Sequence, residues 1–185
     1  MRILIVFCLL LLSIACRSQQ FILKDYGDSM HNVDKGHLEK TFPHFGASDM
    51  KGKYFSDSLL IGNITLINLW FENCAPCIAE FKRLNEIFEK FQNNKFFNFI
   101  TFMFENDSRI NEIVKRYSLN FPVIPISEEE CHRLNFGSGF STNIIVDKDG
   151  RVFFFKSGGA IQAANASQEI DSTILPKLSQ LLDQN

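Results

Sequence analysis

The chain has 185 residues, with 19 Lys and Arg side chains against 21 Asp and Glu, which gives a formal net charge of −2. That length corresponds to one domain with a short appended segment. The near-neutral charge balance argues against nucleic acid as a partner, because nucleic-acid-binding domains carry a basic stripe. An acidic disordered chain is also excluded, since 45% of the residues are apolar and 13% are aromatic.

The N-terminus has the pattern of a targeting segment. Met1-Arg2 precedes ten apolar residues at 3–12, and small residues follow before a Cys, so residues 1–15 are predicted to be a signal peptide. Ser13-Ile14-Ala15-Cys16 resembles a bacterial lipobox, in which the Cys becomes the lipidated first residue. We therefore expect export to the periplasmic side of the cell envelope, with a lipid on Cys16 holding the protein at a membrane. Ordinary cleavage just past Ser18 would instead give a freely soluble exported protein.

Hydrophobic patterning beyond the signal peptide predicts a single domain. Residues 16–40 are polar without a clear period, so we expect a tether there and the domain proper at 41–185. Apolar runs, helical periodicity and turn signals predict the elements of the domain. In chain order they are a buried strand at 64–70, a helix at 76–91, a strand at 95–104, a helix at 107–117, a short helix starting at the capping box 127–130 and ending at 134, a hairpin with strands at 142–147 and 151–156, and a helix at 167–182 that Pro176 should kink or split.

The order of these elements indicates the fold class. The first strand, helix and second strand form a βαβ unit with a parallel strand pair, and the hairpin adds antiparallel strands. The sequence therefore predicts an α/β fold with a mixed central sheet and helices on both faces.

Two closely spaced cysteines lie in Cys74-Ala75-Pro76-Cys77, directly after the buried strand and at the start of the amphipathic helix. Two intervening residues let the sulfurs meet across the first helical turn. The free N–H groups and partial positive charge of a helix N-terminus stabilise a thiolate, so Cys74, the nearer to solvent, should have a lowered pKa and act as nucleophile. Cys77, one turn further in, should resolve the mixed disulfide. Pro76 suits the first turn, because its missing N–H costs nothing there.

Other interpretations of the cysteines are a metal site and a purely structural disulfide. Zinc would need two further Cys or His ligands, and the candidates form no second spaced doublet. These candidates are His31, His37, His44 and the adjacent Cys131 and His132. Cys131 is the odd thiol, expected to pack in the core, with a third redox thiol as the alternative. We therefore expect redox chemistry that needs neither a metal nor another cofactor.

Residues 64–81, Ile-Thr-Leu-Ile-Asn-Leu-Trp-Phe-Glu-Asn-Cys-Ala-Pro-Cys-Ile-Ala-Glu-Phe, resemble the active-site region of the thioredoxin superfamily, and more narrowly that of the exported TlpA/ResA-like thiol–disulfide oxidoreductases. The shared pattern is an apolar strand ending at Trp70, then the two cysteines, then Glu80. Further matches lie at 121–124 and 139–150. The resemblance covers residues 42–185 and implies a thioredoxin-like fold.

This resemblance implies roles for two further groups of residues. Glu80 corresponds to a partly buried acid that accepts and returns the proton of the resolving thiol. Its position three residues after Cys77 places it on the same helical face, and an apolar pocket would raise its pKa. The alternative is that Glu80 is simply favoured by the dipole of the first helical turn. Phe140, Ser141 and Thr142 correspond to the loop that faces the substrate and the disulfide.

Two positions depart from the family pattern. Asn73 precedes the first Cys, where thioredoxins usually have Trp, and Ser141 replaces the cis-proline that faces the disulfide. A cis bond before a residue other than proline costs about 2.5–4 kcal/mol, so the Phe140–Ser141 bond is either held cis by its surroundings or trans in a different loop. The N–H and hydroxyl of Ser141 could stabilise a thiolate or reposition a substrate backbone; loss of an unneeded cis bond is the alternative.

The sequence thus predicts an exported enzyme that exchanges its disulfide with those of other proteins. A membrane-borne electron donor is expected to re-reduce it, which makes reduction the favoured direction. One alternative is a thiol peroxidase, although its Thr-x-x-Cys arrangement is absent between Leu69 and Cys77. The other is a binding module of the same fold that holds a peptide or a copper ion, and Asn73 and Ser141 favour it.

Overall fold

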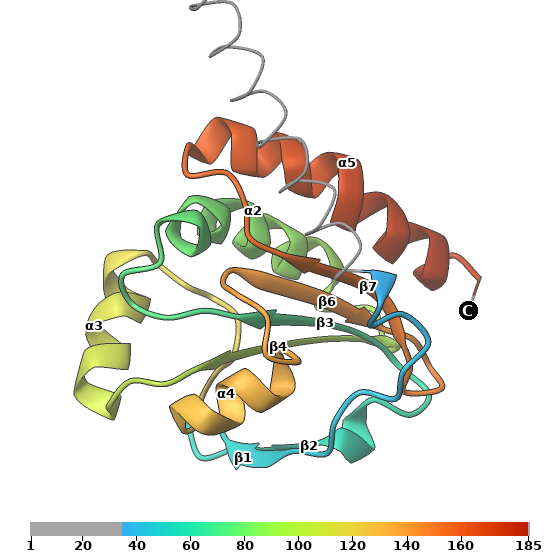
Figure 1. Ribbon diagram of the computed structural model, residues 1–185, viewed down its shortest axis with the longest axis horizontal. Coiled ribbons are helices and arrows are strands. Elements are labelled where there is room, and N and C mark those ends of the chain that lie inside the picture. The colour runs from blue at the N-terminus through green and yellow to red at the C-terminus, as the bar shows by residue number, and fades with distance from the viewer. Residues whose placement is uncertain (1–34, 185) are drawn as a thin grey trace, which may run out of the picture. The chain divides into compact units, whose positions relative to one another are not determined.

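The computed structural model describes residues 35–184, and the compact unit it contains begins at His37. The predicted signal peptide, Cys16 and most of the predicted tether lie outside the described residues. The elements in chain order (Figure 1) are β1 (Gly46–Ser48), β2 (Tyr54–Ser56), the 3-10 turn η1 (Asp57–Leu59), β3 (Ile64–Leu69), α2 (Ala75–Phe91), β4 (Phe97–Met103), α3 (Asp107–Arg116), β5 (Val123–Pro125), α4 (Glu128–Leu134), β6 (Thr142–Val146), β7 (Val152–Ser157) and α5 (Ala163–Leu182).

Five strands form the central sheet, in the order β5-β4-β3-β6-β7. β3 pairs in parallel with β4 and β4 in parallel with β5, whereas β6 pairs antiparallel with both β3 and β7. The predicted parallel βαβ unit and antiparallel hairpin are therefore confirmed, and the sheet is mixed. A separate pair, β1 and β2, is antiparallel.

Helices cover both faces of the sheet, as predicted (Figure 1). α2 and α5 lie against one face, and α4 lies on the opposite side together with the β1–β2 hairpin. The first core contains apolar side chains of α2, α3 and α5, and the second contains those of α4 and the hairpin. Both cores are rich in Phe, so many of the 20 Phe residues of the chain serve to fill the cores. β3 contributes to both cores and all six of its residues are buried, so the residues that follow it are anchored from both sides.

Side-chain caps explain where several helices begin. Ser127 caps α4 by accepting a hydrogen bond from the N–H of Glu130, at 3.1 Å, which agrees with the capping box seen in the sequence. Asn106 caps α3 in the same way through the N–H of Arg109, at 3.0 Å. Cys74 caps α2, and Pro76 lies in the first turn of that helix as expected.

The last helix differs from its prediction in two respects. α5 begins at Ala163, four residues before the predicted start. The sequence did not reveal this first turn, because its residues Ala-Ala-Asn-Ala are small and show no hydrophobic period. The helix also runs unbroken through Pro176, so the predicted split is wrong. Proline removes one backbone hydrogen bond, but the buried side chains Ile170, Ile174, Leu178 and Leu182 lie on one face before and after it. Their burial keeps the two halves aligned as a single helix.

Within residues 35–184, no helix has the length and apolarity needed to cross a membrane.

Candidate active site

The two cysteines form a disulfide at the N-terminus of α2, directly beyond the end of β3. Their Cα atoms lie 5.2 Å apart. Cys74 is the N-cap residue, and its Sγ accepts a hydrogen bond from the N–H of Cys77 at 3.3 Å. The predicted order of strand, cysteine pair and helix is therefore present, and the sulfur of Cys74 already accepts one of the N–H groups that a helix N-terminus offers to a negative charge.

The disulfide is largely covered by the protein. Cys74 retains 3% of its surface exposed and Cys77 retains 1%, so the first cysteine is the more accessible by a small margin. Asn73 and Ala75 on either side of Cys74 are exposed, and Pro76 is partly exposed. A reaction partner would therefore approach Cys74 across this exposed rim.

Trp70 serves as a packing residue beneath the motif. Its side chain is fully buried, and its ring meets that of Phe81 edge-on, with 4.9 Å between centroids. The indole N–H has no hydrogen-bond partner among the described residues. Trp70 thus supports the first turns of α2 from below.

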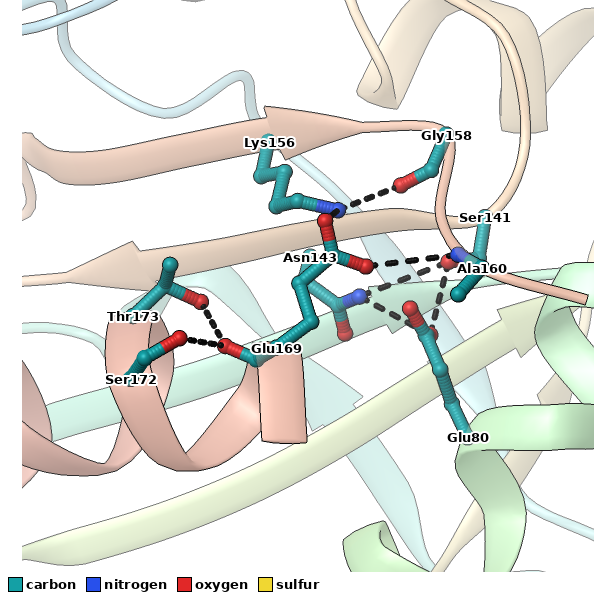
Figure 2. A network of polar contacts seen from close by, with 9 residues as sticks. All are labelled: Glu80, Ser141, Asn143, Lys156, Gly158, Ala160, Glu169, Ser172 and Thr173. Atoms are coloured by element: carbon teal, nitrogen blue, oxygen red, sulfur yellow. Dashed lines mark hydrogen bonds and ion pairs between the residues drawn. The ribbon is translucent and has the colours of Figure 1, made fainter. Parts of the chain in front are cut away.

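Glu80 is buried, with 1% of its surface exposed, and its carboxylate is held by two residues of β6 and the loop before it (Figure 2). Its Oε2 accepts hydrogen bonds from the hydroxyl of Ser141 at 2.6 Å and from Nδ2 of Asn143 at 3.0 Å. Burial raises the pKa of this carboxyl, while the bonds from Ser141 and Asn143 act in the opposite direction. The raised pKa that the sequence predicted for Glu80 thus has desolvation as its main cause.

The loop before β6 lies beside this carboxyl. The peptide bond between Phe140 and Ser141 is cis, so the first of the two predicted alternatives holds. Ser141 is fully buried and directs its hydroxyl to Glu80, while Thr142 donates its hydroxyl hydrogen to the carbonyl of Gly139. The Phe140 ring is half-buried and packs against the rings of Phe71, Phe104 and His132. Partly exposed aromatic rings therefore flank the loop and the segment leading to Cys74.

Sequence reasoning missed four residues near Glu80. Asn143 lies in β6 and also accepts, through Oδ1, a hydrogen bond from Nδ2 of Asn68 on β3 at 2.9 Å. Lys156 and Glu169 form an ion pair at 3.0 Å, and Gly159 lies between them in the chain. A polar Asn within each of two apolar strand segments was the available signal for the Asn68–Asn143 pair. Lys156, Gly159 and Glu169 gave none, because their proximity depends on how α5 packs.

Cys131 is separate from this group. It lies in α4 within the second core, is fully buried, and has no disulfide partner among the residues that the structure describes. Burial raises the pKa of its thiol to about 12. These properties fit the expected packing role. Among residues 35–184, no three His, Cys, Asp or Glu side chains cluster as metal ligands would.

Residues 38–154 match the model of the AhpC/TSA family, and this span is well over half of the chain. The chain belongs to the AhpC/TSA family. Two relatives of this chain are thiol-disulfide oxidoreductases named ResA. The protein is 27% identical to ResA of Bacillus thuringiensis subsp. konkukian over 148 residues, which cover 80% of this chain and 84% of the relative. It is 29% identical to ResA of Bacillus anthracis over 120 residues, or 64% and 69% of the two chains.

Solved structures establish the fold of this AhpC/TSA protein. A putative protein disulfide isomerase from Bacteroides thetaiotaomicron superposes with a TM-score of 0.69 at 17% identity, over 79% of this chain and 90% of that one. A putative thiol:disulfide interchange protein DsbE from Chlorobium tepidum gives 0.65 at 20% identity, over 76% and 97%. The thioredoxin domain of a thiol-disulfide oxidoreductase from Bacteroides vulgatus gives 0.59 at 16% identity, over 73% and 96%. The predicted thioredoxin-like fold and TlpA/ResA-like resemblance are confirmed.

Proposed function

We propose that the protein is a thiol–disulfide oxidoreductase that exchanges its Cys74–Cys77 couple with disulfides of other proteins, acting as a reductant. The observation that carries the proposal is the disulfide itself, which caps the N-terminus of α2 directly after a buried strand. Relatives named as thiol-disulfide oxidoreductases, with more than a quarter of their aligned residues identical, support the same activity.

The first step is attack on the substrate. In the reduced protein, the thiolate of Cys74 attacks one sulfur of a substrate disulfide, forming a mixed disulfide and releasing the other substrate sulfur as a thiolate. The N–H of Cys77 already points at the Cys74 sulfur and would stabilise its negative charge. Asn73, Ala75 and Pro76 would form the rim that the substrate contacts, and the Phe140–Thr142 loop would lie against its backbone.

The second step returns the enzyme to the disulfide form. Glu80 would take the proton of the Cys77 thiol, and the resulting thiolate would attack the Cys74 sulfur, so that the second substrate sulfur leaves as a thiolate. Two electrons pass from the dithiol to the substrate. A carboxyl with a raised pKa suits this exchange, because it binds and releases a proton nearer neutral pH than an exposed Glu does.

Export, anchoring and re-reduction complete the proposal. The predicted signal peptide and lipobox support a protein held by a lipid on Cys16 at the periplasmic side of the cell envelope, where a membrane-borne dithiol donor would re-reduce it. Replacing Cys16 by Ser should abolish incorporation of labelled fatty acid, because the thiol that would carry the lipid is removed. Incorporation of the label by the Cys16→Ser protein would exclude this anchor.

A thiol peroxidase is the first alternative to this activity. The residue three positions before Cys74 is Phe71, and the one three before Cys77 is Cys74, so neither cysteine has the Thr of a Thr-x-x-Cys arrangement. A non-catalytic binding module for a peptide or a copper ion is the second alternative. Turnover of a protein disulfide, without consumption of peroxide, would separate the proposed activity from both.

Reduction of insulin by the dithiothreitol-reduced protein provides the test. Cys74→Ser should be as inactive as buffer. Cys77→Ser should accumulate a mixed disulfide with insulin on Cys74, detectable by mass spectrometry as an adduct that added reductant removes. Cys131→Ala, which leaves the pair intact, serves as the matched control and should retain activity. An unchanged rate in Cys74→Ser would remove this cysteine from the mechanism.

The reduction potential of the couple tests the direction. A reductant should lie near thioredoxin, at about −270 mV, whereas an oxidant would lie near DsbA, at about −120 mV. Equilibration with glutathione buffers, followed by quantification of the Cys74–Cys77 disulfide, measures this value. A result at the DsbA end would reverse the proposed direction of electron flow.

A further inference from the structure

A short turn between β7 and α5 lies directly against the Glu80 carboxyl. A side-chain carbon added to Gly159 would fall 2.9 Å from Oε1 of Glu80, 3.6 Å from Oε2 of Glu169 and 3.7 Å from Cβ of Pro76. The first distance is too short for a carbon atom, so the position requires glycine unless Glu80 moves. The backbone of Gly159 therefore lies close both to the carboxyl of Glu80 and to Pro76 in the first turn of α2.

An ion pair clamps both ends of this turn (Figure 2). Nζ of Lys156 donates to the carbonyl of Gly158 at 2.7 Å and pairs with Oε1 of Glu169 at 3.0 Å. Oε2 of Glu169 accepts a hydrogen bond from the N–H of Ala160 at 3.3 Å. The side chains of Lys156 and Glu169 are 17% and 34% exposed, so the pair is partly shielded from solvent. The turn Gly158–Ala160 is thus tied on one side to β7 and on the other to α5.

The two oxygens of Glu80 have different surroundings. Oε2 is occupied by Ser141 and Asn143, whereas no hydrogen bond from residues 35–184 reaches Oε1, the oxygen next to Gly159. The uncharged Ser141 and Asn143 approach from the β6 side. The charged groups that act on Glu80 are Lys156 from β7 and Glu169 from α5, of opposite sign, and Cys77 on its own helix is in the disulfide. Lys156 favours the carboxylate, and Glu169 favours the protonated acid.

We propose that the Lys156–Glu169 pair, with the turn it clamps, is a positioning device that holds the free oxygen of Glu80 and sets the pH at which this carboxyl exchanges a proton with the Cys77 thiol. The inference rests on the proposed function. Lys156, Gly159 and Glu169 are positioning residues in it, since they act through Glu80 and touch no reacting sulfur.

Charge-removing variants test the proposal by the sign of their effects. Lys156→Met removes the positive charge and should raise the midpoint of the Glu80 titration by about 0.5 pH unit; Glu169→Gln removes the negative charge and should lower it by a similar amount. The double variant should fall between the two. The titration is followed by carboxyl ¹³C NMR of the oxidised full chain, with the Glu80 signal assigned from Glu80→Gln. Mere loosening of the turn would move both single variants in the same direction.

Matched controls come from the other end of the same hairpin. Lys148→Met and Asp149→Asn remove one charge of each sign at exposed positions in the β6–β7 turn, and neither should move the Glu80 midpoint. Shifts of equal sign in Lys156→Met and Glu169→Gln, or no shift in either, would overturn the proposal. The titration needs no turnover, so this result is distinct from failure of insulin reduction, which would overturn the proposed function instead.

Gly159→Ala provides an independent second variant. The added carbon would displace the Glu80 carboxyl, so the resolving step should slow by about tenfold or more. That step is measured by stopped-flow as release of substrate thiol from the mixed disulfide. An unchanged rate together with an unchanged Glu80 titration would show that the turn does not position Glu80.

Discussion

The hydroxyl of Ser141 donates a hydrogen bond to Oε2 of Glu80 over 2.6 Å, although 61 positions separate the two residues in the chain. Both side chains are buried. The bond joins the first turns of α2, which carry the cysteine pair, to the loop before β6. In that loop Ser141 stands where members of the thioredoxin superfamily have a cis-proline. The Ser141 hydroxyl, which a proline at this position would lack, thus donates a hydrogen bond to the carboxyl that is proposed to exchange a proton with the Cys77 thiol.

The difference in stability between the wild-type protein and Glu80→Gln should depend on pH, in a direction fixed by the raised pKa of Glu80. Because the folded state holds the proton more tightly, the carboxyl's contribution to stability is complete below the unfolded pKa and is lost as pH rises through the folded pKa. Glu80→Gln should therefore unfold with nearly the wild-type free energy at pH 4 and with a larger one at pH 8. Urea denaturation at both pH values measures this.

A control and a kinetic readout accompany this variant. Glu89→Gln, on the exposed side of α2, changes the same chemical group outside the buried network. A difference between wild type and Glu80→Gln that stays constant from pH 4 to pH 8 would contradict the expected linkage. In insulin reduction, Glu80→Gln should lower the rate about a hundredfold, the lower end of the usual range for a general acid–base group.

The thiol of Cys131 should be inert in the folded protein. Burial raises its pKa to about 12, so the reactive thiolate is scarce at pH 8, and the fully buried side chain is shielded from reagents. Iodoacetamide added to the reduced native protein at pH 8 should label Cys74, and should label Cys131 only after unfolding in urea. Peptide mass spectrometry distinguishes the sites. Labelling of Cys131 as fast as Cys74 would instead support the alternative that Cys131 is a third redox thiol.

The parts of the fold that were predicted correctly are those that depend on signals from neighbouring residues in the sequence. The βαβ unit, the β6–β7 hairpin and the Ser127 cap each depend on residues close in the chain, and each is present. β1 and β2 were missed, because three residues are too few for an alternating pattern to be recognised. β5 was likewise too short to be assigned a strand of its own, and its segment was recognised only by the resemblance.

The residues of the site likewise fall into those that are close in the sequence, which were predicted, and those that only the fold brings together, which were missed. Cys74, Cys77 and Glu80 lie within one segment of seven residues, so spacing and helical periodicity placed them together. Asn143 reaches Glu80 only because β6 pairs with β3 in a register that sets Asn143 opposite Asn68. Long-range strand register and helix packing decide these contacts, and a single sequence carries no direct record of either.

The N-cap of α4 should have a measurable effect on stability. Ser127→Ala removes the acceptor for the N–H of Glu130 and should lower the free energy of unfolding by about 1 kcal/mol. Ser179→Ala provides the comparison, since Ser179 lies inside α5, where alanine has the higher helix propensity and should raise stability by about 0.5 kcal/mol. Urea denaturation measures both. Equal effects of the two substitutions would show that the cap bond contributes nothing.

Removing the donor of Asn143 tests the buried hydrogen bond between Asn143 and Glu80. Asn143→Asp replaces the Nδ2 donor, 3.0 Å from Glu80 Oε2, by a second carboxylate. Two buried carboxylates at this distance cannot both ionise, so one should remain protonated to a higher pH. We expect the free energy of unfolding to fall by about 3 kcal/mol at pH 8 and by much less at pH 5, where one proton can bridge the pair.

The double variant Glu80→Gln with Asn143→Asp decides whether charge is the cause. The Gln amide can donate where Glu80 accepted, and the Asp carboxylate can accept where Asn143 donated, so the hydrogen bond is restored with its direction reversed. Stability at pH 8 should then recover most of what Asn143→Asp lost, and a double-mutant cycle from urea denaturation gives the coupling. If the double variant is as unstable as Asn143→Asp alone, the loss comes from the Asn68 side of Asn143, and repulsion with Glu80 is excluded as its source.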